Sequence, residues 1–170
     1  MRTLAIDAST KSTGIAIFDN KDLLHYDCIT ASSKDVLTRI KYMTDSLEEV
    51  YKKYTPDQII MEQIIPDNLR SEEWTKNQKT FTALFYLQAA VVLMFHHYSK
   101  QIEFIPANTW RSRCGIKTGP GHKRDSLKED DKRFVQEEYR LTVNDDIADA
   151  ICIGHSKVNE VPAPKPFNWE

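Results

Sequence analysis

The sequence predicts an α/β fold, with a mixed five-stranded sheet (three antiparallel strands, then parallel strands) flanked by helices. Three short apolar runs separated by turn residues occupy the first 30 residues, which is typical of successive hairpins. Two further apolar runs, at 58–61 and 102–105, each follow a long segment of helical periodicity. No internal repeat or linker divides the 170 residues. We therefore expect one domain over 1–158 and an extended tail at 159–170.

The opening hairpin places an acid at the end of a buried strand. The apolar run at 3–7 ends in Asp7, the run at 15–18 returns after a polar turn that leads into Gly14, and a third strand is expected at 23–30. A carboxylate in such a position costs several kcal/mol to desolvate unless a cation or a hydrogen-bond donor meets it. Taken alone, Asp7 could equally cap the turn.

Two long helices flank the fourth strand. Ser33 is the expected N-cap of a helix to about Tyr54, with apolar residues at three- and four-residue spacing on one face. The continuous apolar run at 58–61 is typical of a central strand covered on both faces, and it ends in Glu62. The helix expected over 71–98 is apolar around most of its circumference. Such a helix is deeply buried or pairs with a second subunit, and we expect it to form a homodimer.

The rest of the chain adds a strand, a loop and two helices. The strand at 102–105 is closed by a proline, and the segment 114–121 holds three of the five glycines and should form a loop. The segment 127–139 is charged, with sparse apolar positions, which indicates an exposed helix. Asn144 is expected to cap a last helix that extends to about Lys157.

One segment is strongly basic although the formal net charge of the chain is −2. Between Trp110 and Lys128 there are six lysines and arginines, with Asp125 as the single acid. A local excess of positive charge can neutralise nucleic-acid phosphates even in a chain that is acidic as a whole. A solvated surface loop is the alternative interpretation.

The composition argues against a membrane or secreted protein. The apolar run at 84–95 is too short to span a bilayer, and Gln88 interrupts it. The N-terminus lacks a basic segment followed by a signal-like apolar region, so we expect a cytoplasmic protein. The three cysteines are widely spaced and fit neither a disulfide framework nor a zinc site, so reduced thiols are expected.

Four carboxylates are expected at one edge of the sheet. Asp7 and Glu62 end strands that, if they are neighbours, project both side chains at the same edge. Asp146 and Asp149 lie three residues apart in the last helix and share one of its faces. Asp145 is better explained as a first-turn acid that the helix dipole favours. Near Asp149 the sequence offers no obvious base.

Converging carboxylates repel one another unless cations neutralise them. Oxygen ligands suit Mg²⁺ or Mn²⁺, which keep positions open for water and phosphate oxygens. Two such ions, about 3.5–4 Å apart, would stabilise the attacking and leaving oxygens of a displacement at phosphorus. Zinc is not supported, because His96 and His97 are expected at a solvated helix end.

These motifs, in this order and over nearly the whole chain, resemble the RuvC-type Holliday-junction resolvases, which have a ribonuclease H-like fold. The matching residues are 4–7 (LAID), 61–63 (MEQ) and 146–150 (DIADA). The segment 106–111 and the loop at 119–124 also resemble the basic loop of that family. The family is dimeric, uses Mg²⁺ or Mn²⁺ and makes paired nicks in four-way DNA. The resemblance therefore implies a metal-dependent endonuclease acting on branched DNA.

The resemblance also implies roles for individual residues. Asp7, Glu62, Asp146 and Asp149 would be the catalytic, metal-binding carboxylates, with two ions in the active site. The residues expected to contact DNA are Lys11, Ile65, Arg111, Lys117, Lys123 and Arg124.

Two departures from the family pattern bear on the substrate. Family members insert an aromatic residue at the centre of the junction, whereas Ile64 and Ile65 follow the Glu–Gln pair here. The spacing of lysines after the glycine loop also differs, so the phosphate contact stays open among Lys117, Lys123 and Arg124. Three-way branches are therefore expected substrates beside four-way junctions. The chain resembles compact bacteriophage members of the family, which would act in the host cytoplasm.

Three other functions remain open at this point. A ribonuclease H-like nuclease acting on RNA or RNA–DNA hybrids would share the same carboxylates. Residues 7–14 also resemble the phosphate-binding turn of actin-like sugar kinases, but such proteins need a second, similar domain that 170 residues cannot supply. A non-catalytic junction-binding protein is disfavoured, because binding alone would favour fewer negative charges beside phosphates.

Overall fold

The computed structural model describes residues 1–64, 72–119 and 121–160, with the side chains of 72–76 left aside. Its centre is one five-stranded sheet in the order β3-β2-β1-β4-β5. The strands are β1 (Arg2–Asp7), β2 (Ser12–Asp19), β3 (Asp22–Thr30), β4 (Gln58–Glu62) and β5 (Ile102–Ile105). The first three pair antiparallel, while β4 lies parallel to both β1 and β5. The predicted mixed sheet is confirmed.

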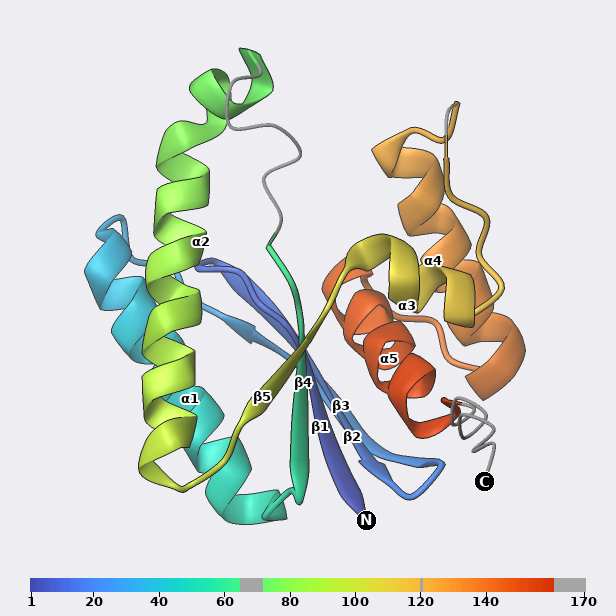
Figure 1. The fold of residues 1–170 in the computed structure, drawn as a ribbon, viewed down its shortest axis with the longest axis horizontal. Coiled ribbons are helices and arrows are strands. Elements are labelled where there is room, and N and C mark those ends of the chain that lie inside the picture. The colour runs from blue at the N-terminus through green and yellow to red at the C-terminus, as the bar shows by residue number, and fades with distance from the viewer. Residues whose placement is uncertain (65–71, 120, 161–170) are drawn as a thin grey trace, which may run out of the picture.

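Helices cover both faces of this sheet (Figure 1). They are α1 (Val36–Tyr54), α2 (Glu72–His97), α3 (Ala107–Arg113), α4 (Arg124–Tyr139) and α5 (Asp145–Val158). Figure 1 shows α1 and α2 on one side and α3, α4 and α5 on the other, so the molecule has three layers.

Three local predictions are wrong. The N-cap of α1 is Asp35, whose carboxylate accepts from the Thr38 backbone N–H at 2.7 Å, and not Ser33. Helix α3 was not expected, because the proline that ends β5 was interpreted only as a stop. Proline without an N–H is tolerated at a helix start, and here Pro106 occupies the N-cap position. Helix α4 begins at Arg124 and is not an exposed helix, since it buries two of its side chains.

Large apolar side chains fill the layer between the sheet and the α1–α2 pair. The buried members are Leu4, Ile6, Ile15, Ile17, Ile59 and Met61 from the strands, Ile40, Met43 and Leu47 from α1, and Leu87, Val91 and Phe95 from α2. By length and composition the span Asn77–His97 of α2, with mean hydropathy 1.3, would suffice to cross a membrane. The helix packs three apolar side chains into the core, although only 17% of this span is buried. The apolar span is thus longer than expected.

On the other face, where α5 lies, small residues stand beside the large side chains of Phe18 and Ile60. Ala5 and Ala16 are fully buried beneath it, and the strands pack on Ala148, Ala150 and Ile151 of the helix. The contact is close enough that only glycine fits at two crossings, at Gly14 of β2 and Gly154 of α5. This close approach carries the N-terminal turn of α5 to the edge where β1 and β4 end.

Candidate active site

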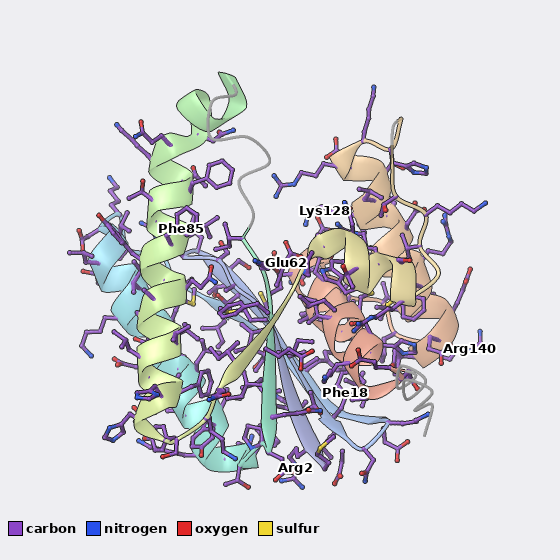
Figure 2. All side chains as sticks on the ribbon, in the orientation of Figure 1. Arg2, Phe18, Glu62, Phe85, Lys128 and Arg140 are labelled. Carbon is purple, nitrogen blue, oxygen red and sulfur yellow. The ribbon has the colours of Figure 1, made fainter. Side chains whose placement is uncertain are left out.

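Asp7 and Glu62 are the last residues of two neighbouring parallel strands. The register pairs Ile6 with Met61, so the two carboxylates follow side by side at the carboxyl edge of the sheet. Figure 2 shows Glu62 at this end and Arg2 at the opposite end. The expectation that these two strands are neighbours is confirmed.

Helix α5 brings two more carboxylates to the same edge. The Asn144 side chain caps the helix by accepting from the Ile147 backbone N–H at 2.9 Å. Gly14 lies opposite Asp7 in the β1–β2 register, and a Cβ there would overlap the backbone carbonyl of Asp146. The Ser12 hydroxyl donates a hydrogen bond to the Asp146 carboxylate. The start of α5 is therefore pressed against β2, directly beside the end of β1.

Glu62 and Asp149 each have a partner that the sequence did not reveal. The indole N–H of buried Trp110 donates to Glu62 Oε2 at 2.9 Å. Lys128 Nζ of α4 lies 3.6 Å from Asp149 Oδ2 and 3.4 Å from Asp145 Oδ2. The prediction that no base lies near Asp149 is therefore wrong. Asp145 pairs with lysines on α4, and its side chain is more exposed than that of Asp149.

A buried ion pair lies behind this edge. The Arg111 guanidinium donates through Nε and Nη2 to both oxygens of Asp131, at 2.8–3.1 Å. Asp131 has no exposed surface, and 12% of the Arg111 side chain is exposed. Asp131 was missed because it stands in an acid-rich run that looks like a solvated helix face. Its four-residue spacing from the apolar residues Leu127 and Val135 was the signal that could have placed it on the inner face.

Burial and mutual repulsion raise the pKa values of the acids at the edge. Desolvation, with the charges of Glu62 and Asp146, raises the pKa of Asp7 to about 7. Desolvation, with the charges of Asp7 and Asp131, raises the pKa of Asp149 to about 9. The pKa of Glu62 is also raised by burial, although the Trp110 hydrogen bond opposes this. These carboxylates lie within each other's field, which is the electrostatic condition that a cation would relieve.

The donor set suits a hard divalent cation. Within the described part of the chain, no three acidic, histidine or cysteine side chains converge closely enough to enclose an ion. Glu62, Asp146 and Asp149 are each held by a different neighbour, which is Trp110, Ser12 and Lys128 respectively. Asp149 Oδ1, however, is buried without a hydrogen-bond partner in the structure. An unpartnered carboxylate oxygen among other carboxylates fits a cation ligand.

The predicted DNA-contacting residues fall into three groups. Lys11, Lys117, Lys123 and Arg124 are exposed, in the β1–β2 turn and in the segment that joins α3 to α4 and begins α4. Arg111 differs, because its guanidinium is turned inwards to Asp131. Ile65 lies outside the described residues.

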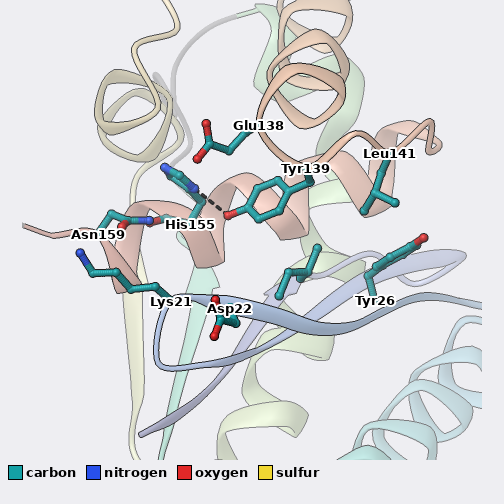
Figure 3. Close-up of a pocket in the computed structure, with 9 residues that line it drawn as sticks. Lys21, Asp22, Tyr26, Glu138, Tyr139, Leu141, His155 and Asn159 are labelled. Atoms are coloured by element: carbon teal, nitrogen blue, oxygen red, sulfur yellow. Dashed lines mark hydrogen bonds between the residues drawn. The ribbon is translucent and has the colours of Figure 1, made fainter.

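A groove elsewhere on the molecule contains none of the predicted carboxylates. It lies between the β2–β3 turn and the C-terminal ends of α4 and α5 (Figure 3). The Tyr139 hydroxyl and His155 Nδ1 are 2.7 Å apart in its wall. Burial lowers the pKa of His155, so its imidazole is neutral at pH 7. The residues that line this groove include none of the four carboxylates of the acidic edge.

The order and direction of the strands, with helices on both faces, define the class of fold, which is ribonuclease H-like. Residues 3–155 match the family model described as crossover junction endodeoxyribonuclease RuvC. The chain belongs to the RuvC family of crossover junction endodeoxyribonucleases.

Curated relatives and solved structures agree with this assignment. The crossover junction endodeoxyribonuclease RuvC of Chloroherpeton thalassium is 28% identical over 170 residues, covering 92% of this chain and 83% of the relative. That of Dictyoglomus thermophilum is 22% identical, covering 90% and 93%. The structure of T. thermophilus RuvC in complex with a Holliday junction substrate matches with a TM-score of 0.70 at 14% identity, covering 92% of each chain. Fowlpox virus resolvase with Holliday junction DNA matches with a TM-score of 0.57 at 16% identity, covering 93% and 97%.

Proposed function

We propose that the protein is a metal-dependent endonuclease that resolves four-way DNA junctions, and also cuts three-way branches, by paired hydrolysis of phosphodiester bonds. The observation that carries this proposal is the meeting of two strand-end carboxylates and two helix carboxylates at one sheet edge. Raised pKa values at Asp7 and Asp149 support it, because they mark acids that a cation would stabilise in their charged form. The names of the relatives support the choice of DNA junctions as substrate.

Asp7, Glu62, Asp146 and Asp149 are the proposed ligands for two Mg²⁺ or Mn²⁺ ions. Bound there, the ions would supply charge stabilisation to the attacking and leaving oxygens at phosphorus. The protein's own part is to hold the four carboxylates in place. Ser12 orients Asp146 and Trp110 orients Glu62 through hydrogen bonds, and Lys128 offsets part of the negative charge beside Asp149.

Exposed basic residues beside the edge are the proposed phosphate contacts. Lys11 would hold DNA on the β1–β2 side, and Lys117, Lys123 and Arg124 on the α3–α4 side. Such contacts fix the register of the branch over the carboxylates without reading its sequence. A contact by Ile65 at the branch point remains a prediction.

A homodimer through α2 would supply the second nick of each pair. The support is the outer surface of this helix, where large apolar side chains are exposed: Phe85 by 37%, Tyr86 by 57%, Val92 by 36% and Leu93 by 68%. Apolar residues gathered on a helix that already fills the core favour a second copy as partner. We further propose a cytoplasmic location, which three free cysteines support.

The first test is the cleavage of labelled synthetic DNA. A four-way junction, a three-way branch, a linear duplex and an RNA–DNA hybrid are incubated with the protein in Mg²⁺ or in EDTA. We expect metal-dependent paired nicks in the four-way and three-way substrates and none in the duplex. Cleavage of the hybrid alone would assign the same carboxylates to a ribonuclease. Tight junction binding without any cleavage would leave a structural DNA-binding protein.

The second test separates chemistry from binding. Asp7→Asn removes one charge at the centre of the acidic edge and leaves the basic loop untouched. Cleavage should fall by about three orders of magnitude, which corresponds to ~4 kcal/mol of lost transition-state stabilisation. Binding of the four-way junction in EDTA, measured by fluorescence anisotropy, should be unchanged or tighter. An equal loss of binding and cleavage in a folded variant contradicts the assignment.

A further inference from the structure

The buried ion pair between Arg111 and Asp131 has an unusual position for two charged groups. Asp131 has no exposed surface, and both of its oxygens accept from one guanidinium at 2.8–3.1 Å. Burying an ion pair is expensive, and apolar residues of similar volume often replace one without loss of stability. Stability alone therefore gives a weak reason for placing this pair inside the protein.

On one side the pair leads to Glu62. The guanidinium carbon of Arg111 lies 4.2 Å from the centre of the Trp110 ring. The same indole donates its N–H to Glu62 Oε2 at 2.9 Å. Arg111 is therefore in direct contact with the ring that orients the carboxylate at the end of β4.

On the other side the pair leads to Asp149. Asp131 belongs to the α4 surface that packs on α5, and its charge acts on Asp149. Lys128, one turn earlier on α4, lies 3.6 Å from Asp149 Oδ2. The pair thus lies between Glu62 and Asp149. It joins α3, which carries the Trp110 partner of Glu62, to α4, which carries the partner of Asp149.

Direct DNA contact is a poor account of Arg111. Two of its donating nitrogens are occupied by Asp131, and little of its side chain is exposed. Arg113, on the same short helix, gives the contrast. It pairs with Glu160 on the surface, where 34% of its side chain is exposed.

We propose that Arg111 and Asp131 are positioning residues for the divalent-cation site, an inference that rests on the proposed function. The pair locks α3 to α4, so that Glu62 (through Trp110) and Asp149 (through the α4 surface) keep the orientations in which they receive cations. Its role resembles that of the outer partners of metal ligands, which orient the ligands without touching the ion. Neither residue touches substrate, so neither is catalytic.

The test uses Trp110 as a reporter of cation binding at Glu62. The other two tryptophans, Trp74 and Trp169, are replaced by Phe in the parent protein, and Mn²⁺ is titrated while fluorescence is recorded. The variant is the apolar pair Arg111→Met with Asp131→Leu. The matched control, Arg113→Met, removes an arginine of the same helix from an exposed ion pair.

We expect the apolar-pair variant to melt near the parent's midpoint but to need about ten-fold more Mn²⁺ for half-maximal change, the effect typical of losing an outer partner of a metal ligand. The control should need the parent's Mn²⁺ concentration. An apolar-pair variant that melts near the parent's midpoint and needs the parent's Mn²⁺ concentration would overturn the inference, because the pair would then be purely structural. If the apolar pair does not fold, Asp131→Asn is judged by the same Mn²⁺ criterion.

The outcomes also separate this inference from the proposed function. A parent that cuts junctions while the variant's Mn²⁺ requirement is unchanged refutes the positioning role alone. A parent that responds to Mn²⁺ but cuts no branched DNA refutes the proposed function, and the shift in the variant still supports positioning. A parent whose Trp110 fluorescence ignores Mn²⁺ overturns the inference itself.

Discussion

The α1–α2 pair rests on one face of the sheet through large apolar side chains. Helix α5 rests on the other face, where glycine and alanine stand beside Phe18 and Ile60. The strands alternate accordingly, with Leu4 and Ile6 facing one layer and Ala5 facing the other. Large side chains hold a helix at an ordinary packing distance from the sheet. Small residues let a helix backbone approach the strands, and this close approach brings the acids of α5 to the edge where β1 and β4 end.

The largest loss of stability and cleavage is expected from a substitution at Gly14, where the backbone of α5 lies against β2. Gly14→Ala places a methyl group on the backbone carbonyl of Asp146, which cannot move aside as a flexible side chain can. We expect the start of α5 to be displaced, with a stability loss of about 3 kcal/mol from overpacking and the loss of measurable cleavage. Thermal melting and junction cleavage test this, the latter well below the melting temperature.

Gly154→Ala is the matched control for that substitution. It lies on the face of α5 that packs on the sheet, and its methyl group would meet the buried Phe18 ring, a side chain, rather than backbone. The control should melt lower than the parent yet cut junctions at the parent's rate in the cold. Equal loss of cleavage in both variants would mean that packing of the whole face, and not the approach at Gly14, positions the acids.

The opposite face should respond in stability alone. Leu87→Ala removes a fully buried side chain between α2 and the sheet. The cavity should cost about 3 kcal/mol, within the range for leucine in a core. Cleavage per folded molecule should be unchanged, because Asp7 and Glu62 follow Ile6 and Met61 along their strands and so face the opposite, α5 side of the sheet. Urea denaturation gives the first quantity and single-turnover cleavage the second. A large fall in the rate of the folded variant would contradict the separation of the two faces.

The sequence alone predicts the sheet and the acids on its strands. Short apolar runs around a polar turn identify β1 and β2, and a continuous apolar run identifies β4. Because β1 and β4 are parallel, their carboxyl ends meet at one edge. Asp7 and Glu62 follow from that logic directly. Asp146 and Asp149 follow from their helical spacing, although the close seat of α5 depends on glycines whose role no single stretch of sequence reveals.

The partners of these acids could not be predicted, because they arise from tertiary packing. Asp131 stands beside other acids and looks solvated until α4 is laid against α3, where Arg111 meets it. Trp110 lies four residues after a proline that was interpreted only as the end of a strand. The short helix that places its indole N–H against Glu62 was therefore missed. Charged groups are assigned to the surface by composition, and only three-dimensional contacts show which of them are buried in pairs.

A pH titration should give a smaller effect that is again confined to the acidic face. The pKa of Asp7 is raised from 3.8 to about 7 and that of Asp149 to about 9. Between pH 4 and 9 the folded protein therefore holds protons that the unfolded chain releases, so the metal-free protein should lose stability as the pH rises through this window. Each unit of raised pKa corresponds to about 1.4 kcal/mol. The charges of Lys128 and Arg111 already limit the rise in the pKa of Asp7.

Thermal melts in EDTA from pH 5 to pH 9 provide the measurement for this prediction. The parent should melt progressively lower with rising pH, and Asp149→Asn, which cannot ionise at that position, should show a shallower decline. Saturating Mg²⁺ should flatten the parent's curve, because a cation favours the ionised carboxylates. A metal-free protein that gains stability from pH 5 to pH 9 would contradict the burial of these acids.

The smallest change per residue is expected outside both faces, in the loop that leads into α4. Replacing Lys123 and Arg124 by Ala removes two exposed charges, whereas Lys52 and Lys53 in the last turn of α1 provide a control of equal charge. If the loop grips phosphates, the loop variant should bind junctions more weakly, and the slope of log affinity against log salt should fall by about two. The control should leave both unchanged.

Cleavage at saturating protein should be equal in all three proteins, since counterion release governs encounter with DNA and the buried acids govern the chemical step. A loss of rate at saturation would instead place these cations beside the reacting phosphate and make the loop part of the active site.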